Sequence, residues 1–407
     1  MVKTLLKDVI KTNTNSYQKI DNWEYINYLD TGNLTENNIS EIVLFKPSID
    51  KIPSRAKRKV KVGDILYSTV RPNQKHYGYI DKEYDNLLVS TGYIVIEPNN
   101  KIINGKYLYY YLTQDKIVNY LQTIAENTVA TYPSISPKDI EDLVVDLPSL
   151  QNQNKMASIL SNYDKLIENN NKWIKILEEL AQKIYKEWFV DFKFPNHETA
   201  TFKQTDLGKI PNNWEIKQIG KEYKTYLGGT PSRNEEKYWN GKIPWLNSGK
   251  TNELRITKAS EYVTELGLEK SSTKLMPQYT TVLAITGATL GQVSMLGSEM
   301  CANQSVVGIY SDKNPEYVFY LMKDKIQKLI QSASGGAQQH INKDIVNEMK
   351  FVLPADTMLN DFKDIIRPIN KEIFNLLYKN HTLKQTRDLL LPRLISGKID
   401  VEKLEIL

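Results

Sequence analysis

Two stretches of this 407-residue sequence, LPSLQNQNKMASIL (147–160) and LPADTMLNDFKDII (353–366), begin alike and decide the fold. They start 353 − 147 = 206 residues apart. Beyond them, at the same offset, apolar residues recur in both copies at alternating steps of four and three, which is the heptad spacing of a coiled coil. Each stretch therefore predicts a long helix with one narrow apolar seam, and such a helix requires a partner helix.

The predicted seams contain apolar residues and a few polar interruptions. The apolar members are Leu160, Ile167, Ile174, Leu177 and Ile184 in the first helix, and Ile366, Ile373, Leu376, Leu383 and Leu390 in the second. The polar members Asn170, Asn380 and Arg387 would fix the register at a cost in stability. Pro368 and Pro392 predict a kink or a restart in the second helix, because proline donates no amide hydrogen bond.

The duplication extends backwards from both helices. Leu29–Gly32 (LDTG) matches Leu246–Gly249 (LNSG) at an offset of 246 − 29 = 217, and the DKI at Asp115 matches the DKI at Asp324. The chain is thus two divergent copies of one unit, each a mixed globular part followed by a long helix. We expect an α+β fold in which two mixed α/β parts, in pseudo-twofold arrangement, are joined by two long antiparallel coiled-coil helices. The predicted segments are 1–148 (first globular part), 149–195 (first helix), 196–354 (second globular part, with a linker at 196–209) and 355–407 (second helix and tail).

If each helix has about 35 residues at ~1.5 Å per residue, it is roughly 50 Å long. That length exceeds one turn of B-DNA, about 34 Å. The helices could serve as a spacer between two binding parts, or they could form a plain structural coiled coil. The seam pattern alone leaves both interpretations open.

Composition excludes several classes of protein. The 53 basic and 48 acidic residues give a formal charge of only +5, so any basic surface must be local. One cysteine, Cys301, excludes a disulfide framework and a cysteine-rich zinc site. No apolar run is long enough for a membrane span or a signal peptide, and we expect a soluble, cytoplasmic protein without metal or membrane partner.

The sequence carries no recognisable catalytic frame. Ser248–Thr251 (SGKT) looks like the end of a P-loop, but Pro244 stands where that motif requires glycine. A dinucleotide fingerprint and an HExxH motif are also missing from the sequence. We therefore expect no autonomous enzyme.

The first globular part contains two candidate nucleic-acid contacts. The run KIPSRAKRKVK (51–61) has no acidic residue, and basic side chains supply the phosphate contacts of DNA-binding proteins. Just beyond it, RPNQKHY (71–77) is rich in the side chains that read guanine and adenine edges. A solvated basic loop and a polar hairpin loop are the plain alternatives. The candidate residues are Arg55, Lys57, Arg58, Lys59, Lys61, Arg71, Asn73, Gln74, Lys75 and Tyr77.

The second globular part has polar loops of the same kind, rich in amide side chains and glycine. Their candidate DNA contacts are Thr230, Ser232, Arg233, Asn303, Gln304, Gln338, Gln339 and His340, with Tyr132 in the stretch of the first copy that corresponds to the last three. The cluster Tyr107 to Tyr111 could stack on bases, but its helical setting favours packing.

Six further strings point to one family: WFVDF (188–192), LGKIPNNWE (207–215), GTPS (229–232), YWNG (238–241), IPWL (243–246) and LLLPRLISGKI (389–399). With the duplication, this set resembles the specificity subunit of Type I restriction–modification systems over nearly the whole chain. One departure is that the first copy lacks the IPxxWE opening.

The resemblance implies a DNA-reading subunit without a catalytic site. Each globular part would be a target recognition domain for one half of a split, asymmetric site in double-stranded DNA. The helices would set the unread gap and bind two methyltransferase subunits, which bring S-adenosylmethionine and methylate adenine. Restriction subunits with ATP- and magnesium-dependent translocation would complete the complex. A protein-binding adaptor, a stand-alone DNA-binding regulator and a fragment of a fused restriction enzyme are the alternatives.

Overall fold

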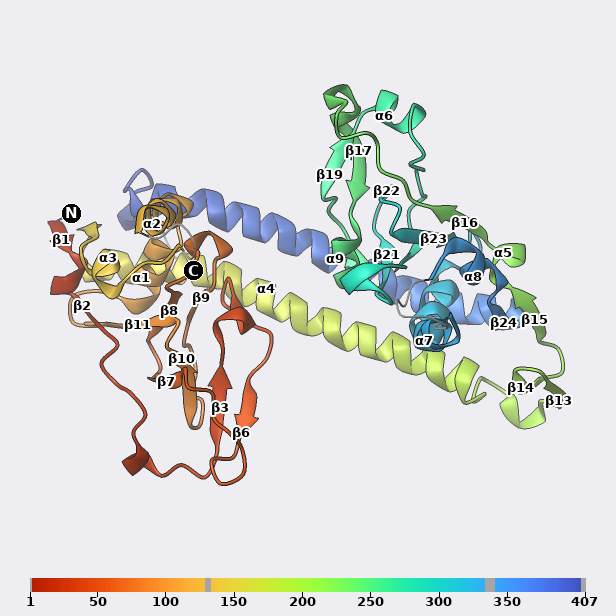
Figure 1. Cartoon of the computed structure of the whole chain (residues 1–407), viewed down its shortest axis with the longest axis horizontal. Helices are drawn as coiled ribbons and strands as arrows, with labels where there is room; N and C mark the ends of the chain where they lie inside the picture. Colours follow the sequence, from red (N-terminus) through yellow and green to blue (C-terminus); the bar gives the residue numbers. More distant parts are fainter. Residues whose placement is uncertain (1, 129–132, 334–340, 404–407) are drawn as a thin grey trace. The chain divides into compact units, whose positions relative to one another are not determined.

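The computed structural model describes residues 2–128, 133–333 and 341–403, and the chain divides into two compact units (Figure 1). Unit 1 comprises Met1–Ile167 with Thr382–Leu407, and unit 2 comprises Glu168–His381. Each unit holds one globular part and a stretch of both long helices. The predicted segments treat the helices as separate pieces, whereas in the structure each helix contributes to both compact units.

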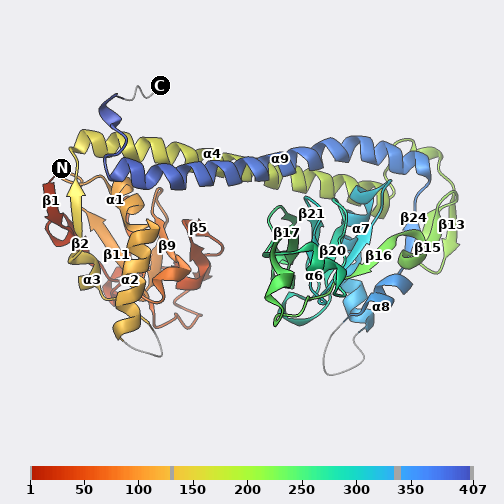
Figure 2. The same ribbon diagram turned by 90° about the horizontal axis from the view of Figure 1, so that it is seen from above.

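The two long helices are α4 (Leu150–Tyr185), which continues into a π-helical turn at Lys186–Val190, and α9 (Asp356–Ile395). Inside each unit they lie side by side (Figure 2). They run antiparallel, since Asp164 contacts Arg387 in unit 1 and Asn170 contacts Asn380 in unit 2. All ten apolar seam residues named above are buried or half-buried.

Helix α9 continues without interruption through both of its prolines, so the predicted restart is wrong. Pro368 and Pro392 both lie at exposed positions. A proline there leaves the carbonyl four residues earlier without its amide donor, but water can take the place of that donor. Packing of the buried face of α9 therefore keeps the helix continuous through both prolines.

The globular part of unit 1 contains two four-stranded sheets and three helices. The first sheet has the order β6 (Val43–Phe45), β3 (Ile26–Leu29), β10 (Leu87–Ser90), β7 (Ala56–Lys59), and the second has the order β2 (Ile10–Thr12), β11 (Tyr93–Pro98), β8 (Ile65–Ser68), β9 (Tyr77–Tyr79). Two small pairs are β1 (Val2–Leu5) with β12 (Val144–Leu147) and β4 (Leu34–Thr35) with β5 (Asn38–Ile39). The helices are α1 (Gly105–Leu112), α2 (Asp115–Thr128) and α3 (Pro137–Glu141).

The globular part of unit 2 has a five-stranded and a three-stranded sheet. The larger has the order β16 (Lys224–Leu227), β23 (Val306–Tyr310), β20 (Thr281–Ala284), β21 (Val293–Leu296), β18 (Arg255–Ile256), and the smaller has the order β19 (Glu261–Val263), β17 (Trp239–Leu246), β22 (Cys301–Ala302). The small pairs are β13 (Phe202–Thr205) with β14 (Gly208–Pro211) and β15 (Glu215–Gln218) with β24 (Lys350–Leu353). The helices are α5 (Ile219–Glu222), α6 (Glu265–Glu269), α7 (Pro315–Ala333) and α8 (Lys343–Glu348).

Strand order shows the duplication directly. The series β2-β11-β8-β9 recurs as β16-β23-β20-β21, and β6-β3-β10 recurs as β19-β17-β22. Both three-strand series contain one parallel pair, β3 with β10 and β17 with β22. The copies differ at the sheet edges, because unit 1 adds β7 and unit 2 adds β18. The predicted α+β class, with two mixed parts and two long helices, is confirmed.

The tyrosine-rich segment belongs to the core. Tyr107, Tyr109, Tyr110 and Tyr111 are all less than a tenth exposed, so packing, rather than base stacking, describes them. The Tyr107 hydroxyl donates to the carbonyl of Asp146, and the equivalent Tyr317 hydroxyl donates to the carbonyl of Val352. Within the described ranges of the chain, no helix has the length and apolar character to cross a membrane.

Candidate nucleic-acid interface

Two loops of unit 2 that are far apart in sequence meet at one place. The loop 228–235 follows β16, and the loop 303–305 connects β22 with β23. The amide of Gly229 donates to the carbonyl of Ala302 at 2.8 Å, and the Thr230 hydroxyl donates to Oε1 of Gln304 at 2.6 Å. A side chain at Gly228 would place its Cβ 2.0 Å from the carbonyl oxygen of Asn303, so only glycine permits this approach.

Arg233 is the one basic residue of the loops 228–235 and 303–305. Its guanidinium carbon lies 3.7 Å from the centroid of the Trp239 ring. Both terminal nitrogens donate to the Glu261 carboxylate, each at 2.7 Å, and the side chain is still 52% exposed. These hydrogen bonds raise the pKa of Arg233 and lower that of Glu261. The bidentate pair fixes the plane of the guanidinium and occupies its end-on edge.

One edge of the Arg233 guanidinium stays available. The Nε–H has no hydrogen-bond partner among residues 2–128, 133–333 and 341–403. An Nε–H and an adjacent Nη–H form the second bidentate edge of an arginine, which suits two acceptors on one base. Arg233 is thus held by one edge and exposed at the other.

The neighbouring predicted residues are partly exposed around Arg233. Ser232 and Gln304 are exposed, whereas Thr230 and Asn303 are half-buried. The side-chain oxygen of Asn303 accepts a hydrogen bond from the amide of Ser305 at 3.2 Å. The structure therefore brings Thr230, Ser232, Arg233, Asn303 and Gln304 together into one surface.

Sequence reasoning missed the residues that support this surface. Glu261 and Trp239 fix Arg233, and the Trp239 indole donates to the carbonyl of Ser232 at 3.1 Å. Trp239 lies in YWNG (238–241), one of the strings that carry the family resemblance, and that string could have pointed to it. Glu261 is 261 − 233 = 28 residues from its partner, and no local pattern connects them.

In unit 1 the predicted basic run forms the edge strand β7 and its surroundings. Among the residues that the structure describes, Arg55 and Lys57 are exposed and lack an ion pair. Lys59 pairs with Asp21 at 2.5 Å, and Lys61 pairs with Glu97 at 2.5 Å. Arg58 is half-buried, and burial lowers its pKa. Two of the five candidate cations in this run, Arg55 and Lys57, are therefore available to an anionic partner.

The strand β7 lies where unit 2 has its Arg233 surface. The carbonyl of Lys57 accepts from Tyr17 in the loop after β2, and the carbonyl of Arg55 accepts from Thr91 between β10 and β11. Those two loops correspond to the loop after β16 and the loop between β22 and β23. Both copies thus present cations at the same position of the fold, although different elements supply them.

The loop Arg71–His76 lies elsewhere, after β8. Arg71, Asn73 and Gln74 are exposed, and Arg71 adopts a left-handed backbone at φ 48°. Lys75 instead pairs with Asp115 at 2.9 Å and with Glu36 at 3.7 Å.

Tyr77 is 5% exposed, with its ring centroid 5.6 Å from that of Tyr67 and 6.2 Å from that of Tyr109. Its ring has little surface to offer to DNA. Tyr132, Gln338, Gln339 and His340 lie outside the described residues and stay predictions.

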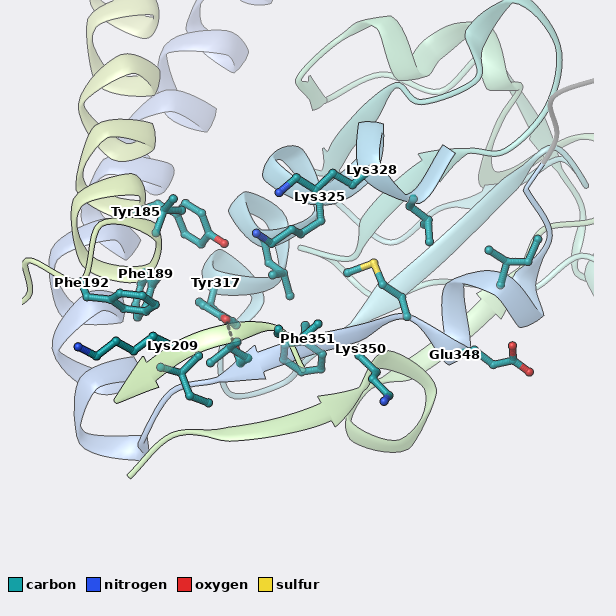
Figure 3. A pocket seen from close by; sticks show the side chains of 18 residues that line it. Tyr185, Phe189, Phe192, Lys209, Tyr317, Lys325, Lys328, Glu348, Lys350 and Phe351 are labelled. Carbon is teal, nitrogen blue, oxygen red and sulfur yellow. Dashed lines mark hydrogen bonds between the residues drawn. The ribbon is translucent and has the colours of Figure 1, made fainter. Parts of the chain in front are cut away.

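A cavity of about 620 Å³ also lies inside unit 2, at the end of α4 (Figure 3). Apolar side chains such as Phe189 and Phe192 line it, and four lysines surround them: Lys209, Lys325, Lys328 and Lys350. None of the predicted DNA contacts that the structure describes lines this cavity. Groups of three or more His, Cys, Asp or Glu side chains placed for a metal ion are not found in the part of the chain described.

Comparisons with known proteins agree with the duplicated architecture. The family model described as "Type I restriction modification DNA specificity domain" matches residues 2–179 and 211–378. The HindI specificity subunit of Haemophilus influenzae is 26% identical, over 91% of this chain and 94% of its own length. The MjaIX specificity subunit of Methanocaldococcus jannaschii is 27% identical, over 94% and 85%.

A solved structure shows the same fold. The crystal structure of the Type-I restriction-modification system S subunit from M. genitalium superimposes with a TM-score of 0.56 at 14% identity, over 97% of this chain and 95% of that one. Two copies of the family domain cover most of the present chain. The chain therefore belongs to the Type I restriction modification DNA specificity family and is a specificity subunit of a Type I restriction–modification system.

Proposed function

We propose that this chain reads a split, asymmetric site in double-stranded DNA, one half with each globular part, on behalf of a complex that methylates adenine. The observation that carries the proposal is the pair of corresponding surfaces: β7 with Arg55 and Lys57 in unit 1, and the Arg233–Gln304 surface in unit 2. Their residues differ, so the half-sites they read differ as well.

The two surfaces serve different contacts. Lys57 lies on the edge strand β7 and Arg55 directly before it, and two exposed cations at a sheet edge suit phosphate oxygens and give sequence-independent affinity. Arg233 is held in a fixed plane with one bidentate edge open, which suits O6 and N7 of a guanine. Arg71, Asn73 and Gln74 are exposed on a second loop of unit 1 and supply further base contacts.

The methyltransferase partner docks on the helices. Trp173, Ile176 and Leu180 of α4 are 53%, 53% and 45% exposed, and their spacing of three and four residues forms a second apolar seam. An exposed apolar seam of this kind suits an apolar helix of a partner subunit. The partners, two methyltransferase subunits and the restriction subunits, would hold S-adenosylmethionine, ATP and magnesium. The chain itself carries no catalysis and acts in the cytoplasm, where its DNA target lies.

Salt dependence separates the two kinds of contact. In complex with its methyltransferase subunit, the double variant Lys57→Gln, Arg55→Gln should bind all DNA sequences more weakly and lower the salt slope by about 1 to 2. Arg233→Ala should instead relax discrimination at one base by about tenfold. Fluorescence anisotropy at several salt concentrations measures both effects.

A matched control is Lys101→Gln, which removes one charge from another exposed position of unit 1. It should leave affinity and slope unchanged. If Lys57→Gln, Arg55→Gln alters discrimination at a single base and leaves the slope unchanged, the phosphate assignment is wrong.

An adaptor that binds only protein is the second candidate, favoured by the exposed seam of α4 alone. It predicts a stable complex with the methyltransferase subunit and no DNA affinity above that of the methyltransferase by itself. The anisotropy experiment distinguishes the two functions.

A further inference from the structure

In each unit an ion pair at one corresponding helix position connects the globular part to a long helix, and the polarity of this pair is opposite in the two units. In unit 1 the globular part supplies the acid: Glu36 accepts a hydrogen bond from Lys384 of α9. In unit 2 it supplies the base: Arg255 of β18 lies 3.3 Å from Glu178 of α4. At this place the two copies therefore carry ion pairs of opposite polarity.

Unit 2 has a further ion pair of the unit 1 polarity, in which Arg367 of α9 lies 2.9 Å from Glu316 of α7. The reversal therefore concerns the helix position held by Lys384 in unit 1 and by Glu178 in unit 2.

The helix positions correspond residue by residue. At the offset of 206 that relates the helices, Glu178 matches 178 + 206 = Lys384, so an acid in one copy is a base in the other. Glu36, at the offset of 217 for its segment, matches 36 + 217 = Glu253, which pairs with Lys250, and Arg255 stands two residues beyond it. The helix members of the two ion pairs thus correspond at their offset, and their globular partners lie two residues apart in the alignment.

A tyrosine beside each ion pair also contacts different partners in the two units. The strings KYLYYYL (106–112) and EYVFYLM (316–322) align at an offset of 210 and match Tyr110 with Tyr320. In unit 1 the Tyr110 hydroxyl donates to Asp164 of α4, which also accepts from Arg387 of α9. In unit 2 the Tyr320 hydroxyl accepts from Arg255 at 3.2 Å.

Each unit therefore places one guanidinium near this tyrosine, but a long helix supplies it in one unit and the globular part supplies it in the other. In unit 1 it comes from the helix, as Arg387, whose counterpart in unit 2 is 387 − 206 = Ala181. In unit 2 it comes from the globular part, as Arg255. The acid Asp164 is replaced by 164 + 206 = Asn370, whose side-chain oxygen accepts from Arg255 at 2.8 Å.

The unit 2 contact is the more buried of the two. Arg255 is 3% exposed, with its guanidinium carbon 3.9 Å from the centroid of the Phe319 ring, and Glu178 is 8% exposed. Removing one member of such a pair leaves a buried charge without its partner, and that is more costly than losing an exposed pair. A like charge opposite either member would be worse still.

We propose that this reversed polarity assigns each globular part to its own stretch of the helix pair. The globular part of unit 2, docked on the helix residues of unit 1, would place Arg255 against Lys384 and Arg387. The globular part of unit 1, docked on the helix residues of unit 2, would place Glu36 against Glu178. Each helical stretch thus accepts a domain of one charge pattern and rejects the other, which restricts the exchange of recognition domains between the two positions.

A charge-reversal cycle in the full-length chain tests the pairing without DNA. Lys384→Glu and Glu36→Lys should each lower the melting temperature by roughly 2–4 °C, and the double variant should recover at least half of the summed loss. Lys165→Glu, an equal charge change at an exposed position of α4 in unit 1, is the control and should have no effect. Independent, additive effects of the two substitutions would overturn the proposal.

A domain exchange tests the selectivity, and its activity readout rests on the proposed function. In a full-length chimera, a second copy of residues 210–353 replaces residues 2–147, so that a unit 2 domain meets the unit 1 helices. The substitutions Lys384→Glu, Arg387→Ala and Asp164→Asn give those helices the unit 2 pattern. With the methyltransferase subunit, the substituted chimera should methylate a site made of two second half-sites at least about tenfold faster than the unsubstituted chimera.

The methylation rates of the two chimeras decide whether the charge pattern assigns the domains. Equal rates for the two chimeras, with measurable activity, overturn the assignment. If neither chimera is active, the melting cycle in the native chain decides. If the wild-type complex methylates no DNA, the proposed function has failed, while the melting cycle still judges the charge pairing alone.

Discussion

Arg233 is the residue at which the local chemistry and the proposed function meet. Glu261 takes one bidentate edge of its guanidinium, and Trp239 supports one face. A side chain fixed in this way loses little conformational freedom when it meets a base, which favours discrimination. The arrangement makes Glu261 a positioning residue for the proposed DNA contact.

Glu261→Gln tests that role. A glutamine offers one acceptor oxygen and no charge, so Arg233 should lose its fixed plane. We expect discrimination at the base read by Arg233 to fall about fivefold, equivalent to ~1 kcal/mol, with non-specific affinity unchanged. Methylation rates on the cognate site and on a site changed at one base measure it. Unchanged discrimination would show that Glu261 is only structural.

Asp64 is a buried acid whose charge opposes folding. It is 4% exposed, its Oδ1 has no hydrogen-bond partner, and burial raises its pKa to about 6 from an ordinary 3.8. The folded state binds this proton more tightly than the unfolded state, so its contribution to stability falls as pH rises from about 4 to about 6.

Asp64→Asn removes that penalty and keeps an acceptor for the amide of Lys61. Near pH 8 the free energy of unfolding should rise by about 1 kcal/mol, and near pH 4 the gain should vanish. Urea denaturation at the two pH values measures it. A gain of equal size at both values would show that the charge is not its cause.

At the level of the helices, a cluster of asparagines fixes the register of α4 against α9. Asn170 donates to Asn380 at 2.7 Å, and Asn380 donates to Asn171 at 2.8 Å, all within unit 2. Asn170 is 8% exposed, so its amide depends on these partners. Such a pair specifies which residues face each other, at some loss of stability relative to leucine.

Asn380→Leu should destabilise the chain by about 1–3 kcal/mol, because it leaves the Asn170 amide buried without a partner. The double variant Asn170→Leu, Asn380→Leu should be at least as stable as the wild type, since both polar groups are then gone. Thermal unfolding of both variants provides the comparison. A neutral Asn380→Leu would mean that the amide pair does not contribute.

The exposed apolar seam of α4 is the proposed docking surface for the methyltransferase subunit. Replacing Trp173, Ile176 and Leu180 by glutamine should weaken binding of the methyltransferase subunit by at least about tenfold, because large apolar residues dominate helix-to-helix recognition. The chain should still fold, since these side chains are exposed. Glutamine at the exposed positions Lys172, Lys175 and Glu179 is the matched control for size-exclusion binding measurements. Equal binding by both triple variants would place the partner elsewhere.

At the scale of the whole molecule, the duplication was predictable because apolar spacing survives divergence. The heptad steps after Leu147 and Leu353 predicted both long helices and the polar positions Asn170 and Asn380. The helical setting predicted for Tyr107 to Tyr111 is α1, which ends at Leu112, and a separate helix, α2, begins at Asp115. Gln114, between them, is buried and bonds back to the carbonyl of Tyr111 at 3.1 Å, a local choice that composition does not reveal.

The candidate site was less predictable than the fold. The polar, cation-rich loops indicated which segments could contact DNA, but composition does not distinguish a free cation from a paired one. Lys59, Lys61 and Lys75 are held by Asp21, Glu97 and Asp115, whereas Lys57 lacks an ion pair with any described residue. These pairings depend on strands brought together from distant parts of the sequence.

We propose that this one chain reads two different half-sites. The most direct measurement is the methylome of a host without adenine methylation that co-expresses this chain and its cognate methyltransferase subunit. We expect one split motif, with an unread gap of fixed length and a methylated adenine in each half. A stable complex that binds S-adenosylmethionine but leaves no methylated motif, or a motif that is continuous, would contradict it.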